Sequence, residues 1–315
     1  MSGFTWTYDA PTGVYKNHDM SELLRKAAIA ECKFMQFVKP EPGYGKKKGE
    51  SVTITRLSNI DEPTNGRLQE NQLIPEDDLT LSTIAITVSE WGRAVPYTSL
   101  AEDLSKFNIE NMIQVKLRDQ MKLTLDTAAA AAFKTAKVKA IPTGVSSIVF
   151  DTDGTASTTA TSNIFMYHVE QIRDYMKATL LVPSYEGDDY IGLISTKGKR
   201  SIINDPNFEK WHTYVDPSVK FNSELGRIEN IRWIEVNHSN ALSGSLGSGG
   251  VLGEALIFGA DAVAMAVVED PELRADIPKD FGRKKAVAWY GILEFGIIWD
   301  TANAGEARIV HVTSA

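Results

Sequence analysis

The sequence has little of what metal centres, disulfide scaffolds and common catalytic sites are built from. Among 315 residues there is one cysteine, Cys32, so the chain forms no internal disulfide and has no cysteine cluster for zinc. No Gly-x-Ser-x-Gly nucleophile motif occurs. The histidines are scattered, at His18, His168, His212, His238 and His311. We therefore expect no enzyme activity, no catalytic residue, no metal site and no cofactor.

Long apolar runs and a basic charge excess are also missing. No stretch approaches the ~20 apolar residues needed to cross a bilayer. The opening residues, MSGFTWTYDAPTG, lack the basic start and apolar run of a secretory signal. The formal net charge of −8 gives no general attraction to nucleic acid or to anionic membranes. We expect a protein that is made in the cytoplasm and has no membrane partner.

Two glycine- and lysine-rich stretches imitate a phosphate-binding loop without completing its pattern. In GYGKKKGE, residues 43–50, Gly49 is followed by Glu50 instead of Lys. In GLISTKGK the spacing is one residue too long, and Arg200 stands where Ser or Thr would bind Mg²⁺. The first stretch is typical of a solvated hinge.

The strongest pattern in the sequence is one long amphipathic helix, from Phe107 to about Ala136. Its apolar residues recur three and four apart, and neither Gly nor Pro interrupts it. Asn108 is the expected N-cap. The stripe consists of Ile109, Met112, Ile113, Leu117, Met121, Leu125, Ala129 and Phe133.

Residues 43–95 predict a two-stranded arm that leaves the body. Its strands are expected at Ser51–Leu57 and Leu79–Trp91, where the apolar phase of the second strand slips by one residue. Because an isolated ribbon is marginal in water, the arm must lie on another surface. Its base is basic and its outer part is mostly acidic, which favours head-to-tail contact between copies. The residues concerned are Lys46, Lys47 and Lys48 at the base, and Arg67, Glu76, Asp77 and Asp78 farther out.

The N-terminal region combines exposed aromatic residues with a predicted helix. Phe4, Trp6 and Tyr8 lie in an irregular stretch, and we expect them to pack against a neighbouring subunit. A helix is predicted from Met20 to Val38, and Pro40 ends it.

After the arm, Ser99 and Glu102 predict a capped short helix, Leu100 to Ser105.

Residues 145–266 predict a second lobe, inserted between two parts of the first. The elements expected there are a helix at Asn163–Thr179 and strands at Ser147–Phe150, Tyr190–Ser195 and Glu229–His238. The chain would close with a hairpin of two strands, Ala286–Asp300 and Ala307–Thr313, facing the long helix.

The order of these parts resembles that of the coat proteins of tailed double-stranded DNA bacteriophages, the Hong Kong 97-type fold. The likeness covers almost the whole chain and looks nearest to the coat group typified by phage N-four. It is carried by YIGLISTKGKRSIINDPNFEKW, by ELGRIENIRWIEVNHSN with its turn at Gly226 to Ile231, and by EALIFGADAVA. Where that group often has a His-Pro pair, this chain has Ser195-Thr196.

The resemblance implies an α+β capsid fold with five parts. These are an N-terminal arm (1–42), an extended loop (43–95), a peripheral domain with a spine helix (96–144), an inserted axial domain (145–266) and a closing sheet of the peripheral domain (267–315). Some coat proteins of this fold crosslink covalently, but we predict no crosslinking residues in this chain.

The same resemblance implies a major capsid protein that assembles as pentamers and hexamers around packaged phage DNA. Expected partners are other copies of the chain, a portal, a separate scaffolding protein, a decoration or cement protein, and double-stranded DNA held without sequence specificity. The expected location is the virion capsid, after assembly in the host cytoplasm. Two alternatives stay open: a cargo-carrying bacterial nanocompartment of the same fold, and a soluble enzyme with an unrecognised site.

Overall fold

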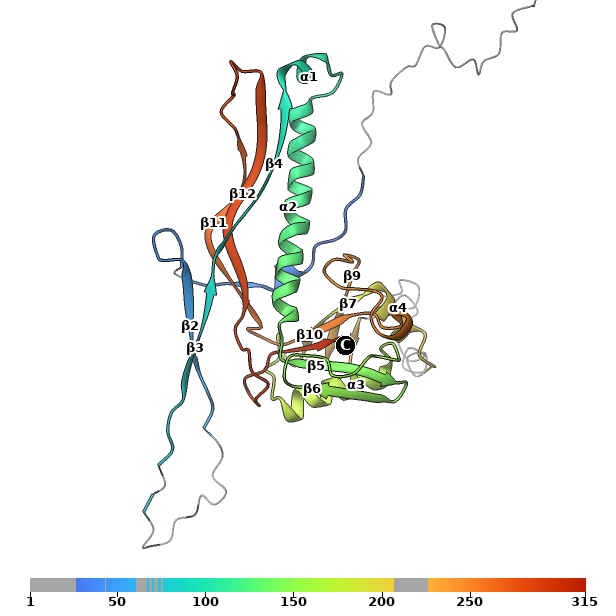
Figure 1. Ribbon diagram of the computed structural model, residues 1–315. Coiled ribbons are helices and arrows are strands. Elements are labelled where there is room, and N and C mark those ends of the chain that lie inside the picture. Colours follow the sequence, from blue (N-terminus) through green and yellow to red (C-terminus); the bar gives the residue numbers. More distant parts are fainter. Residues whose placement is uncertain are drawn as a thin grey trace, which may run out of the picture.

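The long helix is the axis of the molecule. The structure, a computed structural model, describes residues 27–42, 44–60, 67, 70, 73–74, 76–206 and 226–315. Helix α2 (Ile109–Lys134) is flanked by a long sheet and ends in a globular body, and a hairpin extends away on the other side of the sheet (Figure 1). Mixed helices and sheets confirm the expected α+β class. In the described residues, no helix is long and apolar enough to span a membrane.

Helix α2 confirms the predicted periodicity. The Asn108 side chain accepts a hydrogen bond from the backbone N–H of Asn111 at 2.9 Å and caps the helix, as expected. Leu117, Leu125 and Phe133 of the predicted stripe are buried. The short helix α1 (Ser99–Leu104) precedes it, but its cap is Thr98 and not Ser99.

A four-stranded sheet lies along α2. Its order is β1–β11–β12–β4, with bounds Lys39–Pro40, Val263–Ala275, Lys284–Ile297 and Ser89–Thr98. The long β11–β12 hairpin is antiparallel, and β1 adds to β11 in parallel. Val287 and Trp289 of β12 pack with Leu117 of α2, so the sheet and the upper half of the helix share one apolar contact.

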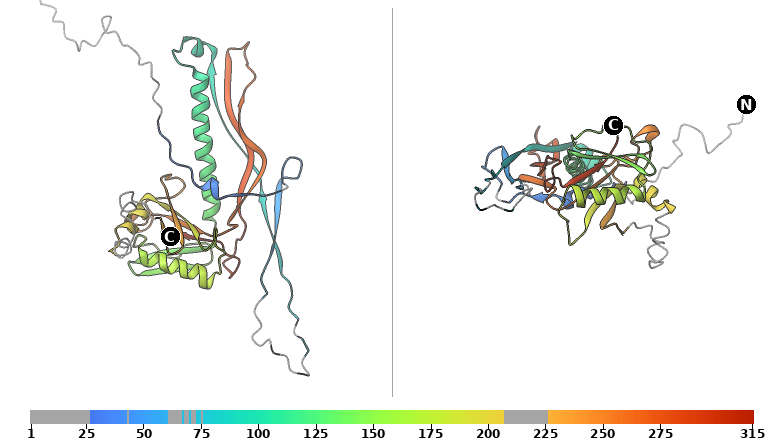
Figure 2. Two further views of the ribbon diagram at one scale, coloured as in Figure 1. Left: turned by 180° about the vertical axis from the view of Figure 1, so that it is seen from behind. Right: turned by 90° about the horizontal axis from the view of Figure 1, so that it is seen from below.

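The body contains a seven-stranded sheet that is covered on both faces. On β7 and β10, alternate residues join two different clusters: Ile194 and Ile257 pack toward α3, whereas Leu193 and Phe258 pack toward the end of α2. Strands buried on both faces are largely apolar, and β10 (ALIF) and most of β7 (YIGLIS) follow this rule. Figure 2 shows α3 along one face. The order is β6 (Ser147–Asp151), β5 (Val138–Gly144), β13 (Ile309–Val312), β10 (Ala255–Phe258), β7 (Tyr190–Ser195), β9 (Ile231–Val236) and β8 (Arg227–Ile228).

In the described part of the body, helical elements flank the seven-stranded sheet. Helix α3 (Met166–Asp174) continues into a π-helical turn, Tyr175–Thr179. The helix predicted at Asn163–Thr179 therefore ends where expected but begins three residues later, at Met166. Helix α4 (Thr196–Ile203) follows β7 directly. A short 3₁₀ turn lies at Ser248–Gly250.

The arm ends earlier in the sequence than predicted, at Val88 and not at residue 95. The predicted strand at Leu79–Trp91 is two strands, β3 (Leu81–Thr87) and β4, which separate at Val88. β3 pairs with β2 (Ser51–Leu57), whose predicted bounds are confirmed. β4 pairs instead with β12 along its whole length. Residues 89–95 therefore belong to the sheet beside α2 and not to the arm.

The predicted closing hairpin is wrong. β12 and β13 lie in different sheets, because the hydrogen-bonding edges of β12 are already occupied by β11 and β4. β13 instead inserts between β5 and β10 of the body. The body thus takes strands from both sides of the predicted 145–266 segment, while β11, from Val263 on, leaves it for the other sheet.

The predicted helix from Met20 to Val38 is also wrong over its described part. Residues 27–33 are irregular, and only the four-residue 3₁₀ turn Phe34–Phe37 is helical. Side chains from distant segments bind three backbone N–H groups here, those of Glu31, Phe34 and Met35, and hold the chain against α2 and the body. Residues 1–26 lie outside the described residues.

Candidate assembly surfaces

Residues 27–41 form a strap that crosses the lower part of α2. The carboxylate of Asp126, which is fully buried, accepts hydrogen bonds from the backbone N–H groups of Phe34 at 2.8 Å and Met35 at 3.4 Å. His238 Nδ1 lies 3.3 Å from its other oxygen. Phe34 is buried against Phe133 of the same helix, with ring centroids 5.7 Å apart. One buried carboxylate therefore joins the strap, the helix and the body.

Further backbone contacts fix both ends of the strap. At its start, Lys116 Nζ donates to the carbonyl of Ala27 at 3.1 Å. In its middle, the Glu31 N–H donates to Asn237 Oδ1 at 2.8 Å. At its end it becomes β1, and Lys39 forms an ion pair with Asp261 at 2.7 Å.

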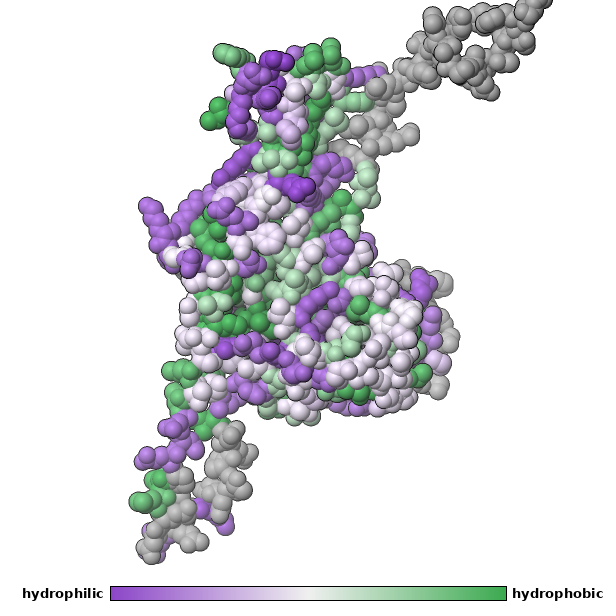
Figure 3. Space-filling view, viewed as in Figure 1, coloured by the Kyte–Doolittle hydropathy of each residue, from purple (hydrophilic) through white to green (hydrophobic). Residues whose placement is uncertain are grey.

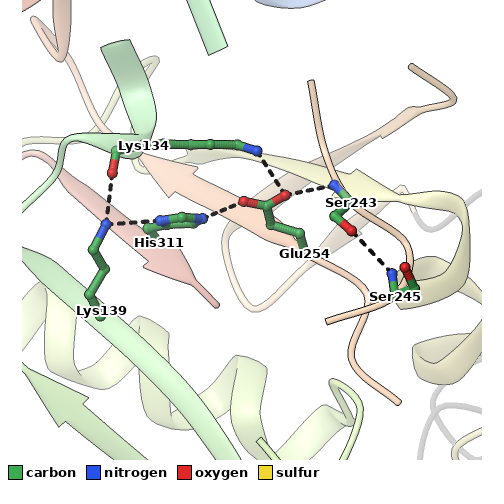
Figure 4. Close-up of polar contacts among 6 residues, drawn as sticks. All are labelled: Lys134, Lys139, Ser243, Ser245, Glu254 and His311. Carbon is green, nitrogen blue, oxygen red and sulfur yellow. Dashed lines mark hydrogen bonds and ion pairs between the residues drawn. The ribbon is translucent and has the colours of Figure 1, made fainter. Parts of the chain in front are cut away.

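A second buried polar network joins the last residue of α2 to the body (Figure 4). Lys134 Nζ binds Glu254 at 2.8 Å, and the Lys134 carbonyl accepts from Lys139 Nζ at 2.7 Å. His311 lies between them, 3.0 Å from Lys139 Nζ through Nδ1 and 2.7 Å from Glu254 through Nε2. Because Lys139 can only donate, Nδ1 accepts and Nε2 carries the proton. The Ser243 N–H also donates to Glu254, at 2.6 Å.

The pKa values of this network reflect its burial. Burial lowers the pKa of Lys139 to about 8 and that of His311 to about 4. Burial alone would raise the pKa of Glu254, but hydrogen bonds from His311 and Lys134 outweigh it and leave that pKa below its usual value. Since Lys139, Glu254 and His311 are all nearly inaccessible to solvent, the network holds elements together and does not face a substrate.

The root of the arm is fastened to the four-stranded sheet and to the residues that follow β12. Arg56 of β2 is buried; its Nη1 donates to the Ile298 carbonyl at 3.2 Å and forms an ion pair with Asp300. Its guanidinium also lies over the Trp299 ring. Ile86 of β3 is buried against Ala264 and Ala266 of β11. The arm therefore leaves the four-stranded sheet from a fixed root, and the sequence did not predict these contacts within the chain.

No family model and no curated protein matches the sequence. Solved structures do match the fold. The acid-stable capsid structure of Helicobacter pylori bacteriophage KHP30 aligns with a TM-score of 0.71 at 10% identity, over 96% of this chain and 97% of that one. Cyanophage Pam1 capsid aligns at 0.68 and 13% identity over both whole chains, and the capsid of Ralstonia phage GP4 at 0.65 and 15%, over 100% and 99%. The chain has the bacteriophage capsid fold. Its finer likeness to the phage N-four coat group stays a prediction.

The extremities of this capsid fold carry exposed apolar side chains. On the outer arm, Leu73 is 91% exposed and Ile74 is 73% exposed. At the opposite end, Phe281 is fully exposed and Ile277 is 83% exposed in the β11–β12 connection, beside α1 with exposed Leu104. Figure 3 shows apolar surface at both ends. Side chains of this kind at the ends of an extended chain indicate surfaces that another molecule covers.

The predicted charged residues lie at opposite ends of the arm. Lys46 binds Glu269 of its own chain at 3.1 Å, and this bond holds the pKa of Glu269 below its usual value. Lys47 and Lys48 are exposed in the same turn. Arg67, Glu76, Asp77 and Asp78 are exposed beyond β2 and β3. Because β2 alone spans ~23 Å, Lys47 in the basic turn does not reach the acidic residues Glu76, Asp77 and Asp78 of its own subunit. Phe4, Trp6 and Tyr8 lie outside the described residues.

The segment GLISTKGK forms β7 and the start of α4, beside an open pocket of about 590 Å³. Ser195 caps α4 by accepting from the Gly198 N–H at 3.4 Å. Lys197, which lines the pocket, donates to the Gly250 carbonyl. The polar groups at the start of this helix thus bind the chain itself.

Sequence reasoning missed Asp126, Arg56 and the Lys139–His311–Glu254 network. One signal was available for Asp126: it is a single carboxylate in LTLDTAAAAAF, next to Leu125 of the apolar stripe. A charge bordering a buried face is rarely tolerated without a partner. For Glu254 and His311 no sequence signal exists, since their partners come from segments up to 172 residues apart.

Proposed function

We propose that this chain is a major capsid protein, which assembles with copies of itself into the shell of a tailed phage. The observation that supports this most is the combination of the capsid fold over nearly the whole chain with exposed apolar residues at its two extremities. A monomer would leave Phe281 and Leu73 in water, whereas a closed shell buries such ends against neighbours.

In this proposal the arm is residues 43–88. The peripheral domain comprises residues 89–134 and 263–297, and the axial domain comprises residues 138–258 and 309–312. These bounds follow the sheet membership of each strand. Pentamers and hexamers are the proposed assembly units, and the arm's outer part lies on a neighbouring copy.

The proposed partners beyond the chain itself are a portal, a scaffolding protein, a decoration or cement protein, and packaged double-stranded DNA. A net charge of −8 supports contact with DNA that is weak and without sequence specificity, since tight binding requires many phosphate contacts by Lys and Arg. The proposed location is the virion capsid, with assembly in the host cytoplasm, and no enzymatic step is assigned to the chain.

The test uses the tip of the β11–β12 connection. A variant with Ile277→Asp and Phe281→Asp places charges on side chains that are already exposed, so folding should be unaffected. We expect its circular dichroism and unfolding midpoint to match those of the natural chain, while particle formation falls at least tenfold. Lys279→Asp in the same connection is the matched control and should assemble. Normal particles from the double variant would refute a role for this tip in assembly.

A further inference from the structure

The pocket of about 590 Å³ beside α4 lies at the ends of two parallel strands of the body. Ser195 ends β7 and Val236 ends β9; the two residues are partners in the parallel ladder, and both line the pocket. Helix α4 begins at Thr196, directly after β7, and forms another wall (Figure 1). The carboxyl ends of parallel strands, where the next helix begins, are a common place for ligands, and the start of a helix favours anions.

The lining of this pocket is polar and positively charged. Nine of the twelve lining residues have polar or basic side chains, and none of the twelve is acidic. Lys197 and Arg200 supply the charge, while Asn204, Asn237 and Ser239 add amide and hydroxyl groups. The volume falls within the range of small-molecule sites, ~300–1,000 Å³. In a chain with a net charge of −8, this lining favours an anion over a cation.

Arg200 is the basic group of the pocket that the fold itself does not use. Lys197 donates to the Gly250 carbonyl. Lys199 forms an ion pair with Glu235 at 2.7 Å in an adjoining smaller pocket, which Arg200 also lines. Within the described part of the chain, the Arg200 guanidinium makes neither a hydrogen bond nor an ion pair. Its donors therefore stay available to a ligand.

The place of Arg200 on α4 brings its side chain toward the start of the helix. Thr196 and Arg200 are four residues apart and so lie on one face of α4, and both line the pocket. Helical side chains lean toward the N-terminus, so the guanidinium extends over the first turn. That turn carries the partial positive charge of the helix dipole. The guanidinium and the helix dipole thus favour negative charge in the same region of the pocket.

We propose that this pocket binds a phosphate group, held by the Arg200 guanidinium at the first turn of α4. A guanidinium matches the geometry of phosphate because it donates two parallel hydrogen bonds. A free phosphate compound and the backbone of DNA both offer this chemistry, and the experiment separates the two sources. The proposal goes beyond the shell role and does not rest on it, since phosphate binding is measured independently of particle formation.

Isothermal titration calorimetry of the full chain with pyrophosphate, at constant ionic strength, tests the site. We expect saturable binding that Arg200→Gln weakens by about tenfold or more, because the charge-assisted bonds are lost. Asn204→Asp, which adds a carboxylate to the lining and removes no cation, should weaken it as well. Both side chains are exposed, so circular dichroism and the unfolding midpoint should not change. The matched control, Arg118→Gln, alters an exposed arginine of α2 outside the lining and should bind within about twofold of the natural chain.

Titration of a short DNA duplex into the same variants distinguishes the two sources. If DNA is the source, Arg200→Gln weakens duplex binding and Arg118→Gln does not. If a free phosphate compound is the source, only pyrophosphate shows this difference between the two variants. Equal effects of Arg200→Gln and Arg118→Gln on both probes, tighter binding of acetate than of pyrophosphate, or no saturable binding of either probe would each overturn the proposal.

Discussion

The side-chain carboxylate of Asp126 accepts a hydrogen bond from the backbone N–H of Phe34, 92 residues earlier in the chain, at 2.8 Å. Asp126 is on α2, and Phe34 belongs to the strap. The bond is buried, and His238 of the body lies against the other carboxylate oxygen. The N-terminal strap is thus built into the core of the subunit at this point, before any contact between copies.

Removal of this carboxylate should loosen the strap. Asp126→Ala leaves the buried Phe34 N–H without an acceptor, and an unsatisfied buried donor costs about 1–3 kcal/mol. We expect the free energy of unfolding to fall by about that amount, measured by chemical denaturation. Limited proteolysis should cut residues 27–38 faster than in the natural chain.

The conservative variant Asp126→Asn is the control, because its amide oxygen can still accept from Phe34. Asp126→Asn should keep most of the stability that Asp126→Ala loses. Its strap should also stay protected from the protease. Equal losses for Ala and Asn would show that the negative charge beside His238 matters, and not the bond to the strap.

The His311 network predicts a loss of stability in acid. In the unfolded chain this histidine takes up a proton near pH 6.5, but burial lowers its pKa in the folded state to about 4. The unfolded state therefore binds more protons between these values, and stability falls as the pH drops from about 6.5 to 4. The gap corresponds to about 3 kcal/mol. Denaturation midpoints across this pH range measure it.

His311→Gln separates this histidine from the other titrating groups. The glutamine amide can still donate to Glu254, but it does not titrate. We expect the variant to lose less stability between pH 6.5 and 4 than the natural chain, by up to about 3 kcal/mol. Parallel pH profiles for the two proteins would mean that His311 is not the group responsible.

Charge reversal at the arm base tests contact between copies. Lys47→Glu with Lys48→Glu should reduce assembly or make it more salt-sensitive, because the acidic tip residues Glu76, Asp77 and Asp78 are the expected partners. One exposed pair is worth only ~0–1 kcal/mol, but a shell repeats it many times. Particle yield is measured by sedimentation over a range of salt concentrations.

Lys46→Glu alone, which breaks the ion pair with Glu269, is a comparison within the same turn. Reversal of the tip charges should partly restore assembly of the Lys47–Lys48 variant, as a double change reports pairwise coupling. If that variant forms normal shells at every salt concentration, the basic turn is a solvated surface. If only DNA filling suffers, the turn contacts DNA.

Local sequence patterns predicted those elements whose partners are local. Helix α2 was predictable because its period, its alanine run and Asn108 all favour one structure. The strand at Tyr190–Ser195 was predictable from six consecutive residues suited to a doubly covered sheet. The order of parts then indicated the capsid fold, although no single motif is specific.

The errors have a common cause in tertiary hydrogen bonding. Residues 27–38 have an apolar helical pattern, yet Asp126 and Asn237 accept from three of their backbone N–H groups, and tertiary contacts override a weak helix propensity. The closing hairpin failed because neighbouring strands in the sequence found better partners elsewhere: β12 in β11 and β4, β13 in β5 and β10. Strand pairing over such distances leaves no local signature.

The central claim is that this chain builds a shell from copies of itself. Negative-stain electron microscopy of the purified full-length chain, expressed with and without its expected scaffolding partner, tests it most directly. The account predicts closed icosahedral particles, or rings of five and six subunits, and loss of both in the Ile277→Asp, Phe281→Asp variant. A monodisperse monomer or small oligomer under every assembly condition would contradict it.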